Sequence, residues 1–177
     1  MDKGAATRVP FKHLLATLFA TILFAWPSWA FAMLGNFENV AAADIENASA
    51  IARKAEAGDP VSQYKVALMY GWGQGFPQSS PHFREWLRKS AENGYYKAQG
   101  LLGATHCFSE WADGDPVEGT KWLYLARESA PPGEQEAAER LLWTAMHHPG
   151  GIADSAEESR RQANNWLREH GRPPMER

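Results

Sequence analysis

The sequence predicts an all-α fold in which antiparallel helix pairs stack as a right-handed α-solenoid. Three observations lead to this prediction. The chain resembles itself at a fixed offset of 36 residues, and capping residues precede proline at several expected helix starts. Apolar residues also recur at spacings of three and four, with no convincing strand alternation. A fixed period in this range is typical of stacked units, none of which buries its apolar face alone.

The internal repeat is clearest around two glycines. The segment "ARKAEAGDPVSQ" at residues 52–63 recurs as "RKSAENGYYKAQ" at residues 88–99. The further residues in register are Trp86 with Trp122 and, after a three-residue insertion, Ala98 with Ala137 and Leu102 with Leu141. Each unit therefore begins and ends at comparable points of the chain.

Capping signals divide each unit into two helices. A capping side chain precedes a proline at the first helical position, where the missing N–H costs nothing, in Asp59-Pro60, Ser80-Pro81 and Asp115-Pro116. Helix stops are indicated at Gly58, Gly94 and Gly171, and a capping box of Ser155 with Glu158 opens the last helix. We expect about seven helices, over residues 40–57, 60–71, 81–93, 96–108, 116–128, 133–147 and 156–170.

The glycine-rich stretch "GWGQGFPQ" at residues 71–78 could be a phosphate loop or a turn. A phosphate loop follows a strand and supplies a lysine beside a serine or threonine. Here a helix precedes the glycines, and that lysine pair is absent. The stretch is therefore interpreted as a turn between helices, with Gly71, Gly73 and Gly75 allowing positive φ or close backbone approach.

The first 32 residues have the pattern of a secretory signal peptide. Three basic residues precede an apolar run over residues 14–26, Pro27 ends the run, and small residues Ala30 and Ala32 suit a signal peptidase. We expect cleavage before Met33, which leaves residues 33–177 as one domain. The alternative is an uncleaved inner-membrane anchor, although the run is short for a bilayer span.

The composition of the domain limits the kinds of partner that it can bind. Removing residues 1–32 leaves 15 of the 18 basic and 20 of the 21 acidic residues, a net charge of about −5. A negative balance argues against nucleic acid and against anionic lipid as the main partner. Cys107 is the only cysteine, so no internal disulfide can form.

The segment "VALMYGWGQGFPQSSPHFREWLRKSAENG" at residues 66–94 resembles one Sel1-like repeat, a relative of the tetratricopeptide repeat. The resemblance places repeats at about 58–93, 94–130 and 132–171, after a lead-in helix near 40–57 and before a short C-terminal tail. The second unit departs from the family at Ser109 and Trp111, and the third contains insertions. The structural repeat positions are Gly58, Ala67, Tyr70, Gly73, Gly75, Trp86, Ala91, Gly94, Trp122 and Trp166.

What this resemblance implies is a scaffold for protein–protein contact, with no catalytic residue, cofactor or metal shared by the family. Stacked helix pairs present a concave face lined by the first helix of each unit. Lys65, Met69 and Gln99 lie on first helices away from the repeat positions, so they are candidates for that face. Trp72 and Trp111 fall in turns, where they could contact a partner or fold back over the stack.

Other chemistry has weaker signals. Adjacent His147 and His148 point about 100° apart on a helix, which does not suit a shared metal, and His106 is expected to pack in the stack. Cys107 could be a reactive or cross-linking thiol, but a small apolar role near a helix end is favoured. Some secreted relatives with paired cysteines have been associated with β-lactamase activity, and this chain lacks those pairs.

The sequence thus predicts an exported, periplasmic or secreted bacterial protein that binds another protein as a scaffold or regulatory adaptor. The partner would be an envelope regulator or an assembly factor. An alternative is an immunity protein that binds and neutralises a secreted toxin. The remaining alternative is a hydrolase of unrecognised type. The sequence contains no nucleophile motif that would support an enzyme.

Overall fold

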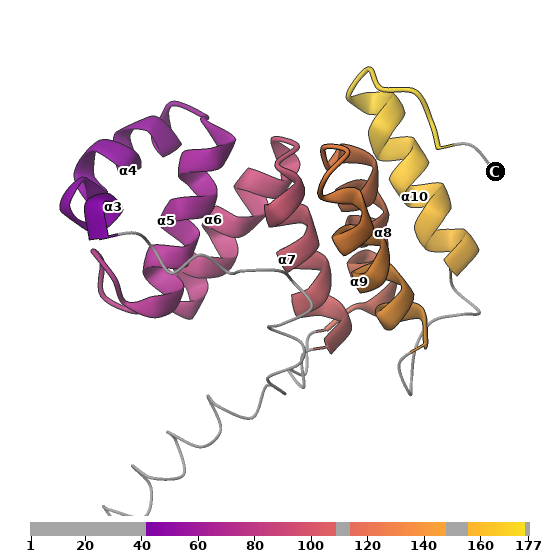
Figure 1. The fold of residues 1–177 in the computed structure, drawn as a ribbon, viewed down its shortest axis with the longest axis horizontal. Coiled ribbons are helices and arrows are strands. Elements are labelled where there is room, and N and C mark those ends of the chain that lie inside the picture. The colour runs from indigo at the N-terminus through magenta and orange to yellow at the C-terminus, as the bar shows by residue number, and fades with distance from the viewer. Residues whose placement is uncertain (1–41, 109–113, 148–155, 176–177) are drawn as a thin grey trace, which may run out of the picture.

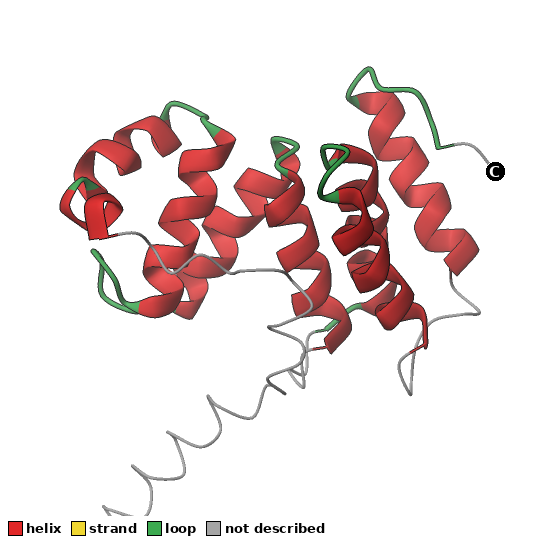
Figure 2. Cartoon of the chain, viewed as in Figure 1, coloured by secondary structure: helices red, strands yellow, loops and turns green. Residues whose placement is uncertain are grey.

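A computed structural model describes residues 42–108, 114–147 and 156–175. Within these ranges the chain forms eight helices and no strand (Figures 1 and 2). The all-α prediction is therefore confirmed for the part of the chain that the structure describes. The expected signal peptide, its cleavage site before Met33, and the residues Trp111, His148 and Ser155 lie outside the described ranges.

The helices have nearly the bounds that the capping signals indicate. They are α3 (Ala42–Glu46), α4 (Ala48–Glu56), α5 (Pro60–Trp72), α6 (Ser80–Glu92), α7 (Tyr96–Phe108), α8 (Pro116–Ser129), α9 (Gln135–His147) and α10 (Ala156–Glu169). The expected first helix is two helices, because the backbone leaves helical geometry at Asn47, with φ −101° and ψ 16°. The Asn47 side chain makes no cap hydrogen bond to α4. Its amide donates to the carbonyl of Ala43, at 2.7 Å.

Side-chain caps start three of the helices. Asp59 accepts from the Ser62 N–H at 2.8 Å at the start of α5, and Asp115 accepts from the Val117 N–H at 2.9 Å at the start of α8. The expected cap of α6, Ser80, is wrong by one residue. The cap is Ser79, whose hydroxyl oxygen accepts from the backbone N–H of His82 at 3.5 Å, and Ser80 is already helical.

The 36-residue repeat is present in three dimensions as two turns with the same hydrogen bonds. The equivalent bonds are Gly58 N–H to Ala55 O and Gly94 N–H to Ala91 O, both 3.0 Å, and Gln63 Nε2 to Ala55 O and Gln99 Nε2 to Ala91 O, both 3.1 Å. Both glycines have positive φ, 96° and 84°. The sequence echo therefore corresponds to a repeated backbone turn with the same glutamine bound to it.

The glycine-rich stretch forms the turn from α5 to α6. Gly73 ends α5 with φ 67°, and Gly75 has φ 81°, conformations that residues with a side chain rarely adopt. Gly71 differs, because it is still helical. Its packing is close, since a Cβ added there would lie 3.1 Å from the Phe83 ring, which would have to shift by a few tenths of an ångström.

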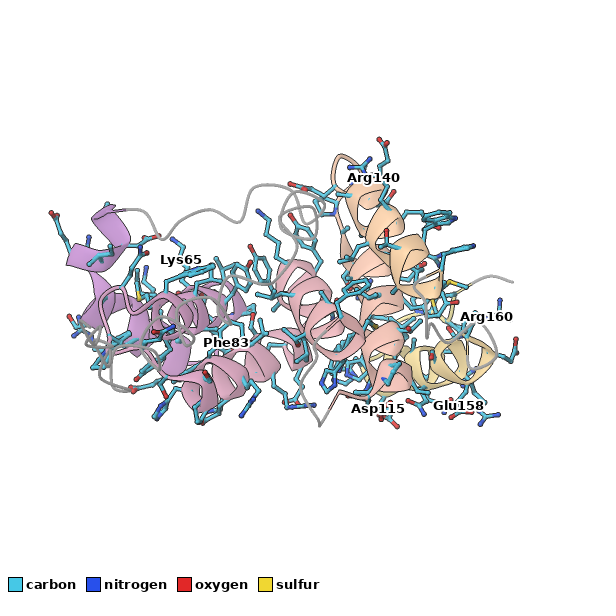
Figure 3. The ribbon with its side chains drawn as sticks, turned by 90° about the horizontal axis from the view of Figure 1, so that it is seen from below. Lys65, Phe83, Asp115, Arg140, Glu158 and Arg160 are labelled. Atoms are coloured by element: carbon cyan, nitrogen blue, oxygen red, sulfur yellow. The ribbon has the colours of Figure 1, made fainter. Side chains whose placement is uncertain are left out.

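Helices that follow one another in the chain pack side by side from α4 to α9, and they form a row (Figure 1). The last helix breaks this pattern, because α10 packs against α8 and not extensively against α9. Figure 3 shows α9 and α10 on opposite sides of the row, marked by Arg140 and by Glu158. This arrangement differs from the third helix pair that the sequence predicts. In register, α9 carries Leu142 where α7 has Gly103, so it lacks the small residue that permits close approach.

The recurring tryptophans lie in or against the core. Trp122 is fully buried, and its ring meets that of Trp166 edge to face with centroids 6.2 Å apart. Trp86 and Trp166 are partly buried and pack against the same core. All three tryptophans therefore contribute apolar area to the core.

Candidate protein-interaction surface

One narrow face of α5 is accessible to solvent. Val61, Lys65 and Trp72 are four and seven residues apart, so they share one side of the helix. Val61 is 41% exposed, Trp72 is 46% exposed, and the Lys65 side chain is 39% exposed. We call these three residues the α5 stripe. Most other residues of the helix are buried.

A cavity of about 470 Å³ opens where the α5 stripe begins. Its walls come from α3, α4 and the first turn of α5, through Asp44, Asn47, Ala50, Ile51, Lys54, Asp59, Val61, Ser62 and Lys65. Lys65 forms an ion pair with Asp44, with Nζ 2.9 Å from Oδ2. The cavity therefore combines an apolar part with two carboxylates and two ammonium groups.

Asp59 remains ionised at the edge of this cavity. Hydrogen bonds from Ser62 lower the pKa of its carboxyl, and the nearby charges of Lys54 and Lys65 act in the same direction. With both signs of charge beside apolar walls, the cavity suits a polar chain with an apolar side chain better than a strongly charged ligand.

The structure separates the five contact residues that the sequence suggests. Lys65 and Trp72 lie on the surface, in the α5 stripe. Met69 and Gln99 are fully buried, so their side chains do not reach a partner on this surface, which corrects the expectation. Trp111 lies outside the described residues.

Sequence reasoning missed an exposed tryptophan on α9. Trp143 is 60% exposed, the most exposed of the large apolar side chains in the described ranges. The signal was present as polar and aromatic residues at spacings of four, three and four: Glu136, Arg140, Trp143 and His147. The labelled side chains Lys65 of α5 and Arg140 of α9 lie on the same side of the row (Figure 3).

Glu118 joins α6 to α8 without forming a catalytic arrangement. Its carboxylate accepts from Lys121 at 2.6 Å and from the Trp122 indole at 2.8 Å, and lies 3.6 Å from Arg88. Burial opposes its ionisation, but the hydrogen bonds and charges of Lys121, Trp122 and Arg88 outweigh burial and lower its pKa. A carboxylate held this way is a structural ion pair and lacks the raised pKa of a general acid.

His106 and His147, two of the histidines considered above as possible metal ligands or core residues, have local partners. His106 accepts from the Asp115 N–H through Nδ1, at 3.3 Å. His147 stacks on Trp143, with ring centroids 4.2 Å apart, and its Nδ1 lies 2.8 Å from the Trp143 carbonyl oxygen. In the described ranges, no group of three histidine, cysteine, aspartate or glutamate side chains is arranged to hold a metal ion.

Cys107 lies at the end of α7, with its sulfur 3.7 Å from the Thr120 hydroxyl oxygen and 3.9 Å from the Pro116 carbonyl oxygen. Burial raises the pKa of this thiol to about 11, and the Thr120 hydrogen bond opposes the shift only in part. The thiol is therefore protonated at neutral pH, which favours the structural role over a reactive one.

We expect Cys107 in the native protein to react slowly with a thiol-specific disulfide reagent. At pH 8 a thiol with a pKa of about 11 is about 200-fold less ionised than one with the ordinary pKa of 8.5. Because the chain has one cysteine, the absorbance of the released reagent follows this thiol alone. The control is the same protein in denaturant, and equal rates in both states would contradict the prediction.

The raised pKa of Cys107 also predicts how the free energy of unfolding changes with pH. The folded state holds the thiol proton to a higher pH than the unfolded chain, so this contribution is complete below about pH 8.5 and is lost as the pH rises toward 11. The Cys107→Ala variant has no thiol to ionise, so its stability should not show this loss.

Comparison with protein-family models, with curated proteins and with solved structures finds no match to this chain. Among the described helices, none has the length and apolar character needed to cross a membrane.

Proposed function

We propose that residues 33–177 form a right-handed α-solenoid of Sel1-like repeats, in which α10 departs from the pairing of the third repeat, and that this domain works as a protein–protein interaction scaffold or adaptor. Its setting is the bacterial envelope, reached through the N-terminal signal peptide, and its role there is regulatory. Support for the repeat comes from the two turns that share their hydrogen bonds at an offset of 36 residues. Support for the setting comes from the sequence pattern of residues 1–32.

The observation that carries the binding role is the α5 stripe with the cavity at its start. A partly exposed tryptophan supplies a large contact area at low entropic cost, and such residues are common interface hot spots. Along α5, Trp72 lies eleven residues from Val61, about 16 Å at the rise of a helix. An extended peptide or an exposed helix of a partner could cover that length, with one apolar side chain in the cavity.

The partner class also follows from what surrounds the stripe. The cavity balances Asp44 and Asp59 against Lys54 and Lys65, so it has no excess charge to attract a nucleic acid or an anionic lipid surface. Mixed charges beside apolar area are typical of reversible protein interfaces. Recognition of a protein segment is therefore the function that this surface supports best.

The test is to find the partner in cells and to break the contact at Trp72. The full chain, with its own leader and a C-terminal tag, is expressed at native level, cross-linked in intact cells, and purified for mass spectrometry. We expect one stoichiometric partner, and we expect Trp72→Ala to weaken its binding by about 30-fold, as for a central hot spot.

Trp143→Ala is the matched control for this experiment, because it removes another exposed tryptophan from a different helix. It should leave the partner bound. Equal recovery of the partner with Trp72→Ala and with the unmodified chain would place the contact elsewhere. Recovery of no protein above background would count against the binding role itself.

A further inference from the structure

The helix α9 is buried on one side only. Its buried residues Leu141, Leu142 and Ala145 face the core. Four of the exposed residues, Glu136, Arg140, Trp143 and His147, follow one line along the opposite side, and Gln135 and Glu139 are exposed beside them. We call these four residues the α9 stripe. The Glu136 and Arg140 side chains are 87% and 52% exposed, and Trp143 is 60% exposed.

The spacing of the α9 stripe is that of a helix-packing seam. Intervals of four, three and four are the d-a-d-a positions of a heptad, the repeat by which two helices pack along their length. In an antiparallel pair, a positions meet d positions. If a two-fold axis crosses the stripe at the level midway between residues 141 and 142, residues at equal distances along the helix from that level face each other.

This symmetry makes the α9 stripe complementary to itself. Glu136 and His147 are equally distant from the axis, and so are Arg140 and Trp143. Glu136 of one copy would therefore face His147 of the second, a carboxylate opposite an imidazole that can donate a hydrogen bond to it. Arg140 of one copy would face the indole of Trp143 of the second, a pairing of guanidinium with an aromatic ring that is favourable in proteins.

Contacts within the helix already hold these side chains in place. Arg140 Nη1 lies 2.6 Å from Glu136 Oε1. The His147 ring stacks on Trp143, with an interplanar angle of 20°. Side chains ordered before association lose less conformational entropy when they are buried by a partner.

We propose that the α9 stripe binds a second copy of this chain, with the two α9 helices antiparallel about a two-fold axis. The stripe spans eleven residues, about 16 Å of helix, which is less than a standard interface of about 1,600 Å² requires. The dimer is therefore weak and reversible, with a dissociation constant in the micromolar range.

The experiment is sedimentation of the exported chain, purified from cells that express it with its own leader, over about 1 to 500 µM. We expect the mass to rise from one copy to two over this range. Trp143→Ala should raise the dissociation constant by about 30-fold. Trp72→Ala, which also removes an exposed tryptophan, should leave it unchanged. A single-copy mass throughout, or a dimer insensitive to Trp143→Ala, overturns the proposal.

A charge exchange tests the register separately from the loss of apolar area. Glu136→Lys replaces the carboxylate that faces His147 of the second copy by an ammonium group, so the favourable contact is lost and the dimer should weaken by about tenfold. Adding His147→Glu to that variant restores opposite charges across the axis, so the double variant should regain the dimer. Circular dichroism checks that each variant keeps its helix content. Failure of the double variant to recover, with its helices intact, would show that these residues do not face each other.

Discussion

Replacing Trp122 by alanine should lower the free energy of unfolding by about 4 kcal/mol, as for other large aromatic side chains in cores. The side chain is 1% exposed, and its ring packs edge to face against Trp166. Its indole N–H donates to Glu118, so the substitution also leaves a partly buried carboxylate with one donor fewer. Equilibrium denaturation followed by circular dichroism measures the change.

Two further variants make this prediction specific. Trp143→Ala removes the same side chain from an exposed position and should change the stability by less than about 0.5 kcal/mol. If the Trp122→Ala protein has no folded baseline, Trp122→Phe provides a smaller cavity and an intermediate loss. Similar effects of Trp122→Ala and Trp143→Ala, measured at low protein concentration, would be inconsistent with a buried Trp122.

Replacing Gly103 by alanine should destabilise the protein by about 2 kcal/mol, although alanine is the better helix former. At this point α7 and α8 approach so closely that an added Cβ would lie 2.7 Å from the Leu123 side chain and 2.8 Å from the Gly119 carbonyl oxygen. The Leu123 side chain is buried and the Gly119 oxygen belongs to the backbone, so neither can move away freely. The helices must separate or distort.

Gly100 is the matched control, one turn earlier on the same helix. A Cβ there would make ordinary contacts of 3.8 Å with Ala126 and 3.9 Å with Leu141. Gly100→Ala should therefore stabilise the protein by about 0.5 to 1 kcal/mol through helix propensity and reduced freedom of the unfolded chain. Denaturant titration of both variants gives the two signs, and a stabilising Gly103→Ala would contradict the α7–α8 packing.

Helix caps and glycine turns were predicted reliably in this chain because each depends on a few adjacent residues. An aspartate cap bonds an N–H two or three residues away, as Asp59 and Asp115 do, so the bond depends on a few adjacent residues. The glycine turns at Gly58 and Gly94 likewise need only a residue that accepts positive φ. The error at Ser79, one residue before the expected cap, occurred where two serines adjoin and either could serve.

The candidate contact residues were harder to predict. Lys65 and Trp72 are accessible as expected, but Met69 on the same helix is not, because α5 is packed by α4 and by α6. Gln99 is buried too, and its amide nitrogen donates to the Ala91 carbonyl, as that of Gln63 donates to the Ala55 carbonyl. Residues off the repeat positions are therefore not necessarily on the surface when a helix has neighbours on more than one side.

The sequence by itself determined that the chain is helical, where most helices begin and end, and which turn recurs after 36 residues. Caps, glycine conformations and apolar spacing act over a few residues, so they can be read from neighbouring letters. Only the tertiary structure decided that α10 packs on α8, that Gly103 and Gly119 bring two helices together, and that Trp143 is exposed on α9. Burial depends on which distant helices meet, and one residue's size, as at Gly103 or Leu142, decides how closely they approach.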